Sequence, residues 1–405
     1  MRVLHVTPYF RPACCYGGPV ESVFRLCLNL ARAGCDVRVL TTNANGREVL
    51  ALNTPRECSF GESFAVRYCA RIARNSVSVE LLRELPAAVE AADLVHLTAV
   101  YSFPTLPVLA ACRHYRKPLV WSPRGALQRW RGSRRGSAKL IWEMLCRALM
   151  PPVALMHVTS AGEREESLHR MPHLDAVIVP NGIAIPPSAR RESGADELRL
   201  GFIGRLDPKK GIENLLEACA IVLRSGLRMH LLIAGGGEPR YEASLRRRIE
   251  TLGLGESVEM CGPLGDTAKR HFFRRLDVAI TPSFTENFAI VVAEALAHGV
   301  PVIASKGTPW ERVEEIGCGL WVDNDPRSLA SAIARMSTLP LTEMGERGRS
   351  WMRREYSWAR IARMMLAAYR SLEGAEAARS ASDASQHPAG RRLMRGSAEA
   401  DAVLR

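Results

Sequence analysis

The sequence predicts an α/β protein with two doubly wound domains that face each other across a cleft. Short β-branched or aliphatic runs alternate with amphipathic stretches along most of the chain, a pattern typical of parallel sheets covered by helices. The alternation occurs twice, on either side of a segment without periodicity. In addition, 405 residues exceed the roughly 250 to 300 at which single hydrophobic cores stop growing. We therefore expect two Rossmann-like domains.

Residues 1–182 are expected to form the N-terminal domain, with strands predicted from short apolar runs. These runs lie at residues 3–8, 37–42, 64–69, 94–98, 119–122, 155–160 and 176–180. The first of them, VLHVTP, is far shorter than the apolar core of a secretory signal and lacks a small-residue cleavage site. We interpret it as a strand.

A linker is predicted at residues 183–197, because the segment NGIAIPPSARRESGADE, residues 181–197, is rich in proline, serine and charge. The alternation restarts in the C-terminal domain, residues 198–355. Its strands are expected at 198–204, 229–235, 257–262, 277–283 and 301–305. Residues 356–372 have the pattern of an amphipathic helix. Residues 373–405 have almost no aliphatic content and are expected to stay disordered.

Composition narrows the class of protein. A hydrophobic content of 47% with 24% charged residues is ordinary for a soluble enzyme, and no apolar run reaches the roughly 18 residues that span a bilayer. The eleven cysteines are scattered without metal-ligand spacing, which favours reduced thiols in the cytoplasm. The net charge of +13 suits a nucleic acid, an anionic membrane surface or a phosphorylated substrate.

The densest basic cluster runs from Arg124 to Arg147 and is opposed only by Glu143. It contains Arg129, Arg131, Arg134, Arg135 and Lys139, interleaved with Trp130 and Trp142. Tryptophans at the interface and arginines near phosphates would suit a helix lying on an anionic lipid surface. A solvated basic face is the alternative. Peripheral binding at the inner face of the plasma membrane is therefore an expectation for this cluster.

Two glutamates eight positions apart, Glu286 and Glu294, are candidate ligands for a sugar. Glu286 follows the predicted strand DVAITPS, and open α/β sheets bind ligands beyond the carboxyl ends of their strands. Glu294 lies about two helical turns further on, on the same side. A carboxylate accepts two hydroxyl hydrogen bonds, which suits vicinal diols, and amides near Phe288 and Ala289 would favour an anion. Two unrelated, solvated glutamates are the alternative interpretation.

Two cations, Arg205 and Lys210, lie in a predicted turn between a strand and a helix in GFIGRLDPKKGIENLLEA. Cations in such a turn can hold a diphosphate and stabilise the charge that develops as it leaves. A basic loop without a ligand is the alternative interpretation.

The glycine and acidic motifs of the sequence argue against redox, kinase and metal-dependent chemistry. Gly17 and Gly18 follow the first strand, where backbone amides can approach a phosphate. No GxGxxG follows a strand and no GxxxxGK[ST] occurs, which argues against redox and kinase chemistry. Asp323 and Asp325 form a DND before Pro326, which we interpret as a helix cap rather than a metal motif. We predict metal-independent chemistry.

The chain resembles the retaining glycosyltransferases of family 4, also called group 1, in the segments GGPVES, SPRGAL, VPNGI, GRLDPKKG, AGGGE, SFTENFAIVVAEA, HGVPVIAS, KGTPWERVEEIGCGLWVDND and SWARIARMMLAAYRSL. The resemblance covers nearly all of residues 1–372. It implies the GT-B architecture, with the donor held mainly by the C-terminal half, the acceptor by the N-terminal half, and a last helix that crosses back to the first domain.

The resemblance also implies roles for single residues. Arg205 and Lys210 would contact the donor pyrophosphate, Glu286 the transferred sugar and Glu294 the ribose hydroxyls. The glycine pair Gly17–Gly18 would close over the phosphates. The donor site would further include Gly204, Gly236, Leu264, Asn287, Phe288 and Ala289.

Two positions depart from the family pattern. Many relatives have a histidine that touches the donor sugar where SPRGAL has Arg124, and an arginine there cannot act as a base. His96, at the end of another predicted strand, is expected either to face the cleft instead or to have a structural role. Ala289 stands where glycine is frequent and is expected to narrow the sugar site slightly.

The residues and the resemblance together predict a hexosyltransferase that needs no cofactor and moves a sugar from a nucleoside-diphosphate sugar to a glycan or lipid-linked saccharide, and the resemblance implies that it is retaining. The resemblance implies lipopolysaccharide, exopolysaccharide or capsule biosynthesis in a bacterial cytoplasm. Two alternatives remain: a nucleotide-sugar epimerase of the same fold, and a basic protein without enzymatic activity that binds nucleic acid. The second lacks any recognition module in the sequence.

Overall fold

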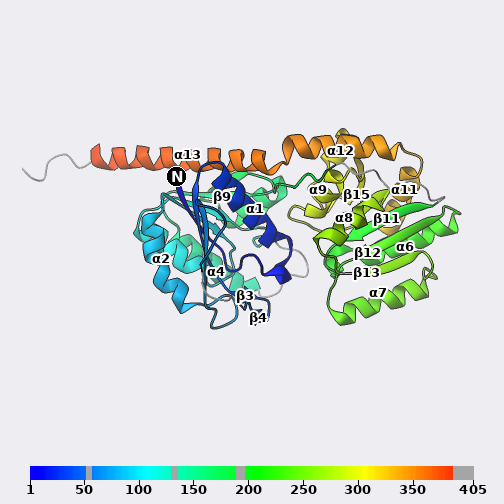
Figure 1. Cartoon of the computed structure of the whole chain (residues 1–405), viewed down its shortest axis with the longest axis horizontal. Coiled ribbons are helices and arrows are strands. Elements are labelled where there is room, and N and C mark those ends of the chain that lie inside the picture. The colour runs from blue at the N-terminus through cyan, green and yellow to red at the C-terminus, as the bar shows by residue number, and fades with distance from the viewer. Residues whose placement is uncertain (52–56, 129–135, 188–196, 386–405) are drawn as a thin grey trace, which may run out of the picture.

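The computed structural model describes residues 1–51, 57–128, 136–187 and 197–385. Two sheets, each covered by helices, lie side by side (Figure 1). Within the described ranges, no helix is both long and apolar enough to cross a membrane.

The N-terminal sheet has eight strands in the order β10-β9-β8-β7-β1-β2-β6-β5. Their bounds are β1 Arg2–Val6, β2 Asp36–Thr42, β5 Glu57–Ser59, β6 Phe64–Cys69, β7 Leu94–Thr98, β8 Leu119–Ser122, β9 Ala154–Val158 and β10 Asp175–Ile178. Every neighbouring pair is parallel except β5 and β6. The short strands β3 Ala44–Asn45 and β4 Glu48–Val49 form a separate hairpin after β2. All seven predicted strands are present, and β3, β4 and β5 are additional.

Helices cover both faces of this sheet. They are α1 Gly18–Arg32, α2 Val79–Ala91, α3 Thr105–His114, α4 Gly136–Leu149 and α5 Ala161–Arg170, with the short 3₁₀ helix η1 Cys14–Tyr16 before α1. Serine caps fix where two of them begin: Ser78 accepts from the Leu81 amide at 3.1 Å, and Ser160 accepts from the Glu163 amide at 3.2 Å. Two apolar clusters pack between these helices and the sheet, so the sheet is buried on both faces, as parallel sheets require.

The C-terminal sheet has six parallel strands in the order β13-β12-β11-β14-β15-β16. Its strands are β11 Leu198–Ile203, β12 Met229–Ala234, β13 Val258–Gly262, β14 Val278–Thr281, β15 Val302–Ser305 and β16 Gly319–Val322. Its helices are η2 Pro208–Lys210, α6 Ile212–Arg224, α7 Pro239–Thr251, α8 Asp266–Arg274, α9 Ile290–Ala297, α10 Arg312–Glu315, α11 Pro326–Met336 and α12 Leu341–Glu355. The five predicted strands are present, and β16 was not predicted.

The chain crosses between the domains at two segments that run side by side. The Ile183 amide donates to the Tyr356 carbonyl at 2.8 Å, and Gly182 packs so closely on the Trp358 ring that a Cβ there would lie 2.4 Å from a ring carbon. The last helix, α13 Trp358–Ser385, then packs along α1 of the N-terminal domain (Figure 1). This confirms the expected return of the C-terminal helix.

The expected end of that helix at residue 372 was wrong. The helix α13 continues through Ser385, because the segment after Leu372 is rich in alanine, which has the highest helix propensity. Residues 386–405 of the tail expected to be disordered, and residues 188–196 of the predicted linker, lie outside the described residues.

The strand orders determine where a ligand can bind. In the C-terminal sheet the direction of winding reverses between β11 and β14, and in the N-terminal sheet it reverses between β1 and β7. Open α/β sheets bind ligands in the crevice beyond the carboxyl ends of the strands at this reversal point. A ligand site is therefore expected at the loops that follow these four strands.

Candidate active site

Lys210 and Glu286 meet at the reversal point of the C-terminal sheet. Lys210 ends η2, which follows β11, and Glu286 lies in the loop that follows β14. The Lys210 ammonium donates to the Glu286 carboxylate, which also accepts from the Ser283 hydroxyl at 2.7 Å. The Glu286 amide donates to the Gly307 carbonyl at 2.8 Å, so the loop is fixed from behind. The sequence predicted both residues, and the structure brings them into contact.

Two further cations surround this pair. Lys209 is partly buried; burial lowers the pKa of its ammonium, and the negative charge of Glu286 opposes that shift. Arg205 is exposed, close enough to Lys209 to affect its pKa, and lines a groove of about 560 Å³ with Gly237 and Tyr241. Sequence reasoning missed Lys209, although the KK pair in GRLDPKKG offered a signal.

Glycines allow the loops at this edge to touch. A Cβ at Gly235 would lie 1.7 Å from the Gly204 carbonyl oxygen, and one at Gly211 would lie 2.2 Å from the Pro282 carbonyl oxygen. The Gly236 carbonyl accepts from the Leu206 amide at 3.0 Å. The glycines Gly204 and Gly236 therefore shape the loops around the predicted donor site. Leu264 packs, partly buried, against the apolar cluster beneath α9.

Glu294 lies inside α9 in a more buried environment. One of its carboxylate oxygens accepts from the Lys269 ammonium at 2.5 Å. The other, Oε2, is buried without a hydrogen-bond partner among the residues that the structure describes. Burial raises the pKa of this carboxyl, and the Lys269 ammonium opposes the shift. A buried acceptor without a partner is poised to accept a hydrogen bond from a ligand hydroxyl.

The start of α9 faces the N-terminal domain. A Cβ at Gly18 would lie 3.5 Å from Ile290 Cγ2, and one at Gly125 would lie 3.0 Å from the Asn287 Cβ. Asn287 Oδ1 is buried, and no described residue donates to it. The negative charge of Glu21, in the first turn of α1, also raises the pKa of the Glu294 carboxyl. The predicted glycine loop at Gly17–Gly18 and the predicted donor residues therefore lie on opposite sides of one domain boundary.

Two neighbouring residues of the predicted donor site have backbone or core roles. Ala289 is the N-cap of α9 with φ of 55°, in the left-handed region where glycine is favoured. Phe288 is buried against Trp310, and the Trp310 indole donates to the Phe288 carbonyl at 2.5 Å. Phe288 therefore has a core role, and both its ring and its carbonyl are engaged by Trp310.

Arg124 lines the same domain boundary, from the N-terminal side. Its Nη1 donates to Asn181 Oδ1 at 2.7 Å, and its Nε is buried without a partner in the described part of the chain. Its φ is 51°, and the next amide, that of Gly125, donates to the buried Glu163 carboxylate at 2.5 Å. A strained loop held by a buried carboxylate thus fixes the direction of the Arg124 guanidinium.

His96 does not face the boundary, so the expectation that it could do so was wrong. Its side chain is fully buried, with one ring nitrogen 2.6 Å from the Tyr369 hydroxyl and the other 2.6 Å from the Ser122 hydroxyl. The ring also packs on His5 at 4.4 Å. Burial lowers the pKa of His96 well below its ordinary value, so the neutral ring links α13 to the N-terminal sheet.

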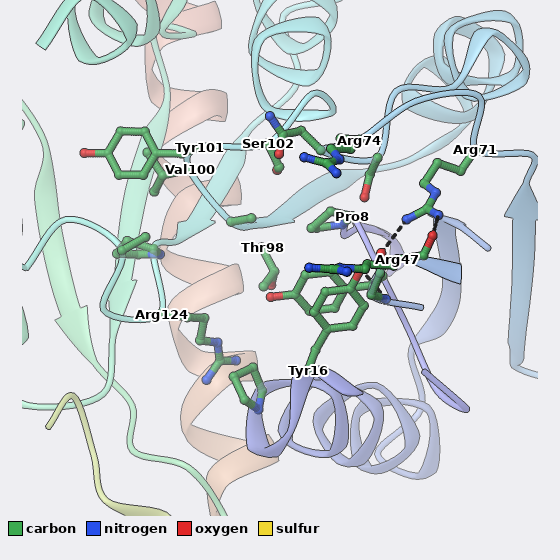
Figure 2. Close-up of a pocket in the computed structure, with 18 residues that line it drawn as sticks. Pro8, Tyr16, Arg47, Arg71, Arg74, Thr98, Val100, Tyr101, Ser102 and Arg124 are labelled. Carbon is green, nitrogen blue, oxygen red and sulfur yellow. Dashed lines mark hydrogen bonds between the residues drawn. The ribbon is translucent and has the colours of Figure 1, made fainter. Parts of the chain in front are cut away.

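A pocket of about 680 Å³, which we call the N-terminal pocket, opens at the carboxyl edge of the N-terminal sheet (Figure 2). Its walls come from residues within the segments 8–19, 46–47, 71–76, 98–102 and 123–126. These segments follow β1, β2, β6, β7 and β8. Sequence reasoning assigned the acceptor to this domain without finding these residues, apart from Arg124. The strand ends themselves were the available signal.

The basic cluster is only partly described, because Arg129, Trp130, Arg131, Arg134 and Arg135 lie outside the described residues. The expectation that Trp142 faces an interface was wrong. Its indole donates inward to the Val100 carbonyl at 2.7 Å, and the next residue, Glu143, is fully buried. The outer face of α4 is apolar instead, with Leu140, Ile141, Met144 and Leu145 between 45% and 61% exposed.

The DND motif caps a helix, as predicted. Asp325 is the N-cap of α11 and accepts from the amides of Arg327 and Ser328 at 3.0 and 2.9 Å, while Asp323 pairs with Lys306 at 2.8 Å. Among the residues that the structure describes, no group of three or more His, Cys, Asp or Glu side chains could hold a metal ion.

Sequence comparison matches two family models. Residues 16–185 match the model described as Glycosyltransferase Family 4, and residues 188–351 match the model described as Glycosyl transferases group 1. The D-inositol 3-phosphate glycosyltransferase of Segniliparus rotundus is 33% identical over 193 residues, which are 45% of this chain and 42% of that protein. The phosphatidyl-myo-inositol mannosyltransferase of Mycobacterium leprae is 33% identical over 208 residues, 49% and 54% of the two chains. The chain thus spans about half the length of the curated relatives it matches.

Solved structures share the fold over more of the chain. Sucrose-phosphate synthase from Thermosynechococcus elongatus superposes with a TM-score of 0.71 and 22% identity, over 92% of this chain and 99% of that one. HepE from Anabaena, solved in complex with UDP, superposes with a TM-score of 0.69 and 17% identity, over 92% and 100%. The expected GT-B fold is confirmed. Because the two family models together cover most of its length, the chain belongs to the family 4, or group 1, glycosyltransferases.

Proposed function

We propose that the protein moves a sugar from a nucleoside-diphosphate sugar to a hydroxylated acceptor, with retention at the anomeric carbon and without a metal ion. The observation that carries this proposal is the Lys210–Glu286 contact at the reversal point of the C-terminal sheet, opposite the glycine loop of the other domain. A cation there suits a diphosphate, and a carboxylate beside it suits sugar hydroxyls.

The proposed reaction breaks the bond between the anomeric carbon and the diphosphate oxygen, and the electron pair leaves with the diphosphate. Lys210 and Arg205 would stabilise the charge that develops on this leaving group, with the amides at the start of α9 as further donors. Glu286 would hold the transferred sugar, and Oε2 of Glu294 would accept from a ribose hydroxyl. The acceptor hydroxyl would attack from the face that the diphosphate leaves, which gives retention, and its proton would pass to the departing diphosphate oxygen on that same face.

The comparisons support this function at the level of the family. Structures with the same fold include HepE in complex with UDP-glucose and WaaG, a glycosyltransferase involved in lipopolysaccharide biosynthesis. Surface-polysaccharide assembly remains the proposed setting, while the relatives named for inositol phosphate and phosphatidylinositol acceptors suggest a phosphorylated acceptor as well. The epimerase and nucleic-acid alternatives gain no support, because both family models describe glycosyltransferases.

The test is slow transfer to water in the absence of an acceptor, followed by proton NMR with UDP-glucose and GDP-mannose in turn. We expect release of the nucleoside diphosphate together with a free sugar that first appears as the α anomer of the donor. A β anomer as the first product would contradict retention. An isomeric nucleotide sugar without release of the diphosphate would support the epimerase instead.

We further propose that the enzyme works in the cytoplasm and docks on the membrane through the outer face of α4. Four large apolar side chains are exposed there, at positions 140, 141, 144 and 145, and the exposed Arg147 follows them. Apolar side chains beside a basic one suit an anionic lipid surface. This proposal replaces the role expected for Trp142.

Sedimentation with vesicles tests the docking face. The double variant Ile141→Asp, Met144→Asp is expected to lose binding to vesicles of phosphatidylglycerol, whereas Val79→Asp, Leu82→Asp on α2 should retain it. The control residues are 43% and 41% exposed and lie in the same domain. Equal binding by both double variants would contradict a role for α4.

A further inference from the structure

The charged side chains that line the N-terminal pocket are all positive. Among the described residues that line it are four arginines, Arg47, Arg71, Arg74 and Arg124, and no aspartate or glutamate. The other lining groups are neutral and include the hydroxyls of Thr98 and Ser102. In a hollow lined by one sign of charge, the field attracts a ligand of the opposite sign.

The arginines of the rim differ in what they contact. Arg71 donates to the carbonyls of Gly46, Arg47 and Glu48 at 2.8, 2.9 and 2.8 Å, so it holds the β3–β4 hairpin in place. In Figure 2 the guanidinium of Arg47 points toward Thr98, and Arg74 lies above it in the view, near Ser102. Neither forms an ion pair with a described residue. Arg71 therefore positions the hairpin, while Arg47 and Arg74 are available to a ligand.

The backbone around the pocket is strained. Asn75, Ser76, Ala99 and Arg124 have φ of 58°, 60°, 112° and 51°, in the region that disfavours residues with a Cβ. All four line the pocket. Such conformations persist only where the surrounding structure holds them and are concentrated at binding and catalytic sites. The strain is thus a second observation, independent of charge, that points to a ligand.

The base of the pocket is aromatic and polar. Tyr9 and Tyr16 stack with their ring centroids 3.8 Å apart, and the Tyr16 hydroxyl accepts from the Gly46 amide at 3.0 Å. Thr98 is almost fully buried, with its hydroxyl 2.9 Å from a ring nitrogen of His5. A flat aromatic surface beside hydroxyl groups suits the face of a sugar ring.

We infer that the N-terminal pocket binds an acceptor that carries a negative charge, a phosphate or a carboxylate on a hydroxylated ring, held between Arg47 and Arg74. This inference rests on the proposed transferase function. Arg124, at the end of the pocket nearest the domain boundary, lies next to Gly125, which contacts Asn287 of the other domain. The anionic group would therefore bind at the outer rim, and the reacting hydroxyl would lie toward the donor.

The test uses calorimetric titration with the full chain. UDP is titrated first, so that a failure of the donor site is seen separately and counts against the proposed function alone. With UDP at saturation, the phosphate-binding residues of the donor site are occupied, and glucose 6-phosphate, glucuronate and neutral glucose are then titrated as probes. We expect the two anionic probes to bind at least tenfold more tightly than glucose, since hydrogen bonds to charged groups are the strong ones. Tighter binding of glucose 6-phosphate would indicate a phosphate on the acceptor, and tighter binding of glucuronate would indicate a carboxylate.

A matched pair of variants completes the test. Arg47→Ala, Arg74→Ala should weaken the anionic probes about tenfold or more, while Arg32→Ala, Arg83→Ala, which removes the same charge from exposed positions on α1 and α2, should stay within about twofold. An unchanged circular-dichroism spectrum and thermal unfolding midpoint, together with retained UDP binding, show that each variant is folded. The inference is overturned if neither anionic probe binds saturably, if glucose binds as tightly, or if both double variants behave alike.

Discussion

At the scale of single residues, the candidate site depends on charges held in partly buried positions. The Lys210 ammonium contacts the Glu286 carboxylate, and the two side chains are 20% and 13% exposed. A diphosphate that enters this loop would compete for the ammonium. The contact therefore holds both side chains oriented before the donor arrives, which is the preorganisation that electrostatic catalysis requires.

Replacement of Lys210 tests this role. Lys210→Ala should lower the turnover number for transfer to water by about 10² to 10³, the loss typical of one electrostatic donor to a developing charge. The control is Lys306→Ala, because Lys306 also pairs with a carboxylate but is 49% exposed in the same domain. Steady-state release of UDP measures both. Wild-type turnover in Lys210→Ala would refute the assignment.

Replacement of Glu294 should affect binding more than chemistry. Glu294→Gln keeps the shape but loses the charge and one of two acceptor oxygens, so the donor KM is expected to rise about tenfold with a much smaller change in kcat. Glu343→Gln, at a 69% exposed position on α12, is the control. A fall in kcat at unchanged KM would place Glu294 at the reaction centre instead.

Three buried histidines give the fold a pH dependence. Burial lowers the pKa of His5 to about 3 and the pKa of His96 and His157 well below the ordinary value. Below pH 6.5 the unfolded chain therefore binds more protons than the folded chain, so stability is lost as the pH falls. From pH 7.0 to 5.5 we expect each histidine to lower the free energy of unfolding by about 1 kcal/mol.

Urea unfolding at several pH values measures this slope. His5→Gln should reduce the change in the free energy of unfolding between pH 7.0 and 5.5 by the contribution of one histidine. His114→Gln, at an exposed position, should leave that change as it is in the wild type. The same pH dependence of the free energy of unfolding in the wild type, His5→Gln and His114→Gln would contradict the role given to burial.

The sequence predicted the residues whose role follows from their place after a strand. It did not predict those whose role depends on whether the side chain is buried or faces the site. Lys210 and Glu286 follow the strands β11 and β14, which become neighbours at the reversal point. His96 also ends a strand, but its ring turns into the core between Tyr369 and Ser122. A one-dimensional pattern does not say which way a strand-end side chain points.

At the scale of elements, glycine loops bring the strand ends close enough to form a site. Gly235→Ala should destabilise the C-terminal domain by more than about 2 kcal/mol, because its Cβ would overlap the Gly204 carbonyl and its φ is 140°. Gly255→Ala is the control, since nothing lies within 4 Å of a Cβ there. Urea midpoints compare the two. Equal midpoints would show that the loops relax freely.

The elements themselves were predictable to different degrees. Short apolar runs predicted twelve strands, whereas β3, β4 and β5 have two or three residues each and leave no periodic signal. The strand β16, GLWV, was missed because charged segments lie on both sides of it. The helix α4 was expected to present its tryptophan outward, but its apolar residues lie on both faces, and only packing decides which face is buried.

At the scale of the whole molecule, the two domains meet at loops and cross at two adjacent segments. The Ile183–Tyr356 hydrogen bond and the helix α13 connect the domains on one side, while on the other Gly18 lies near Ile290 of α9 and Gly125 near Asn287 in the loop before it. The resemblance predicted this arrangement. The composition of the N-terminal pocket was not predictable, because its arginines come from separate loops that only the folded sheet brings together.

The central claim is that cations of the C-terminal domain hold a diphosphate, and the affinity difference between UDP and UMP tests it most directly. Calorimetry on the wild-type chain should give UDP a Kd at least tenfold below that of UMP, with GDP and GMP compared in the same way. In Arg205→Ala, Lys210→Ala this preference should disappear while the monophosphates still bind. Equal affinity for diphosphate and monophosphate in the wild type, or an undiminished preference in the double variant, would contradict the account.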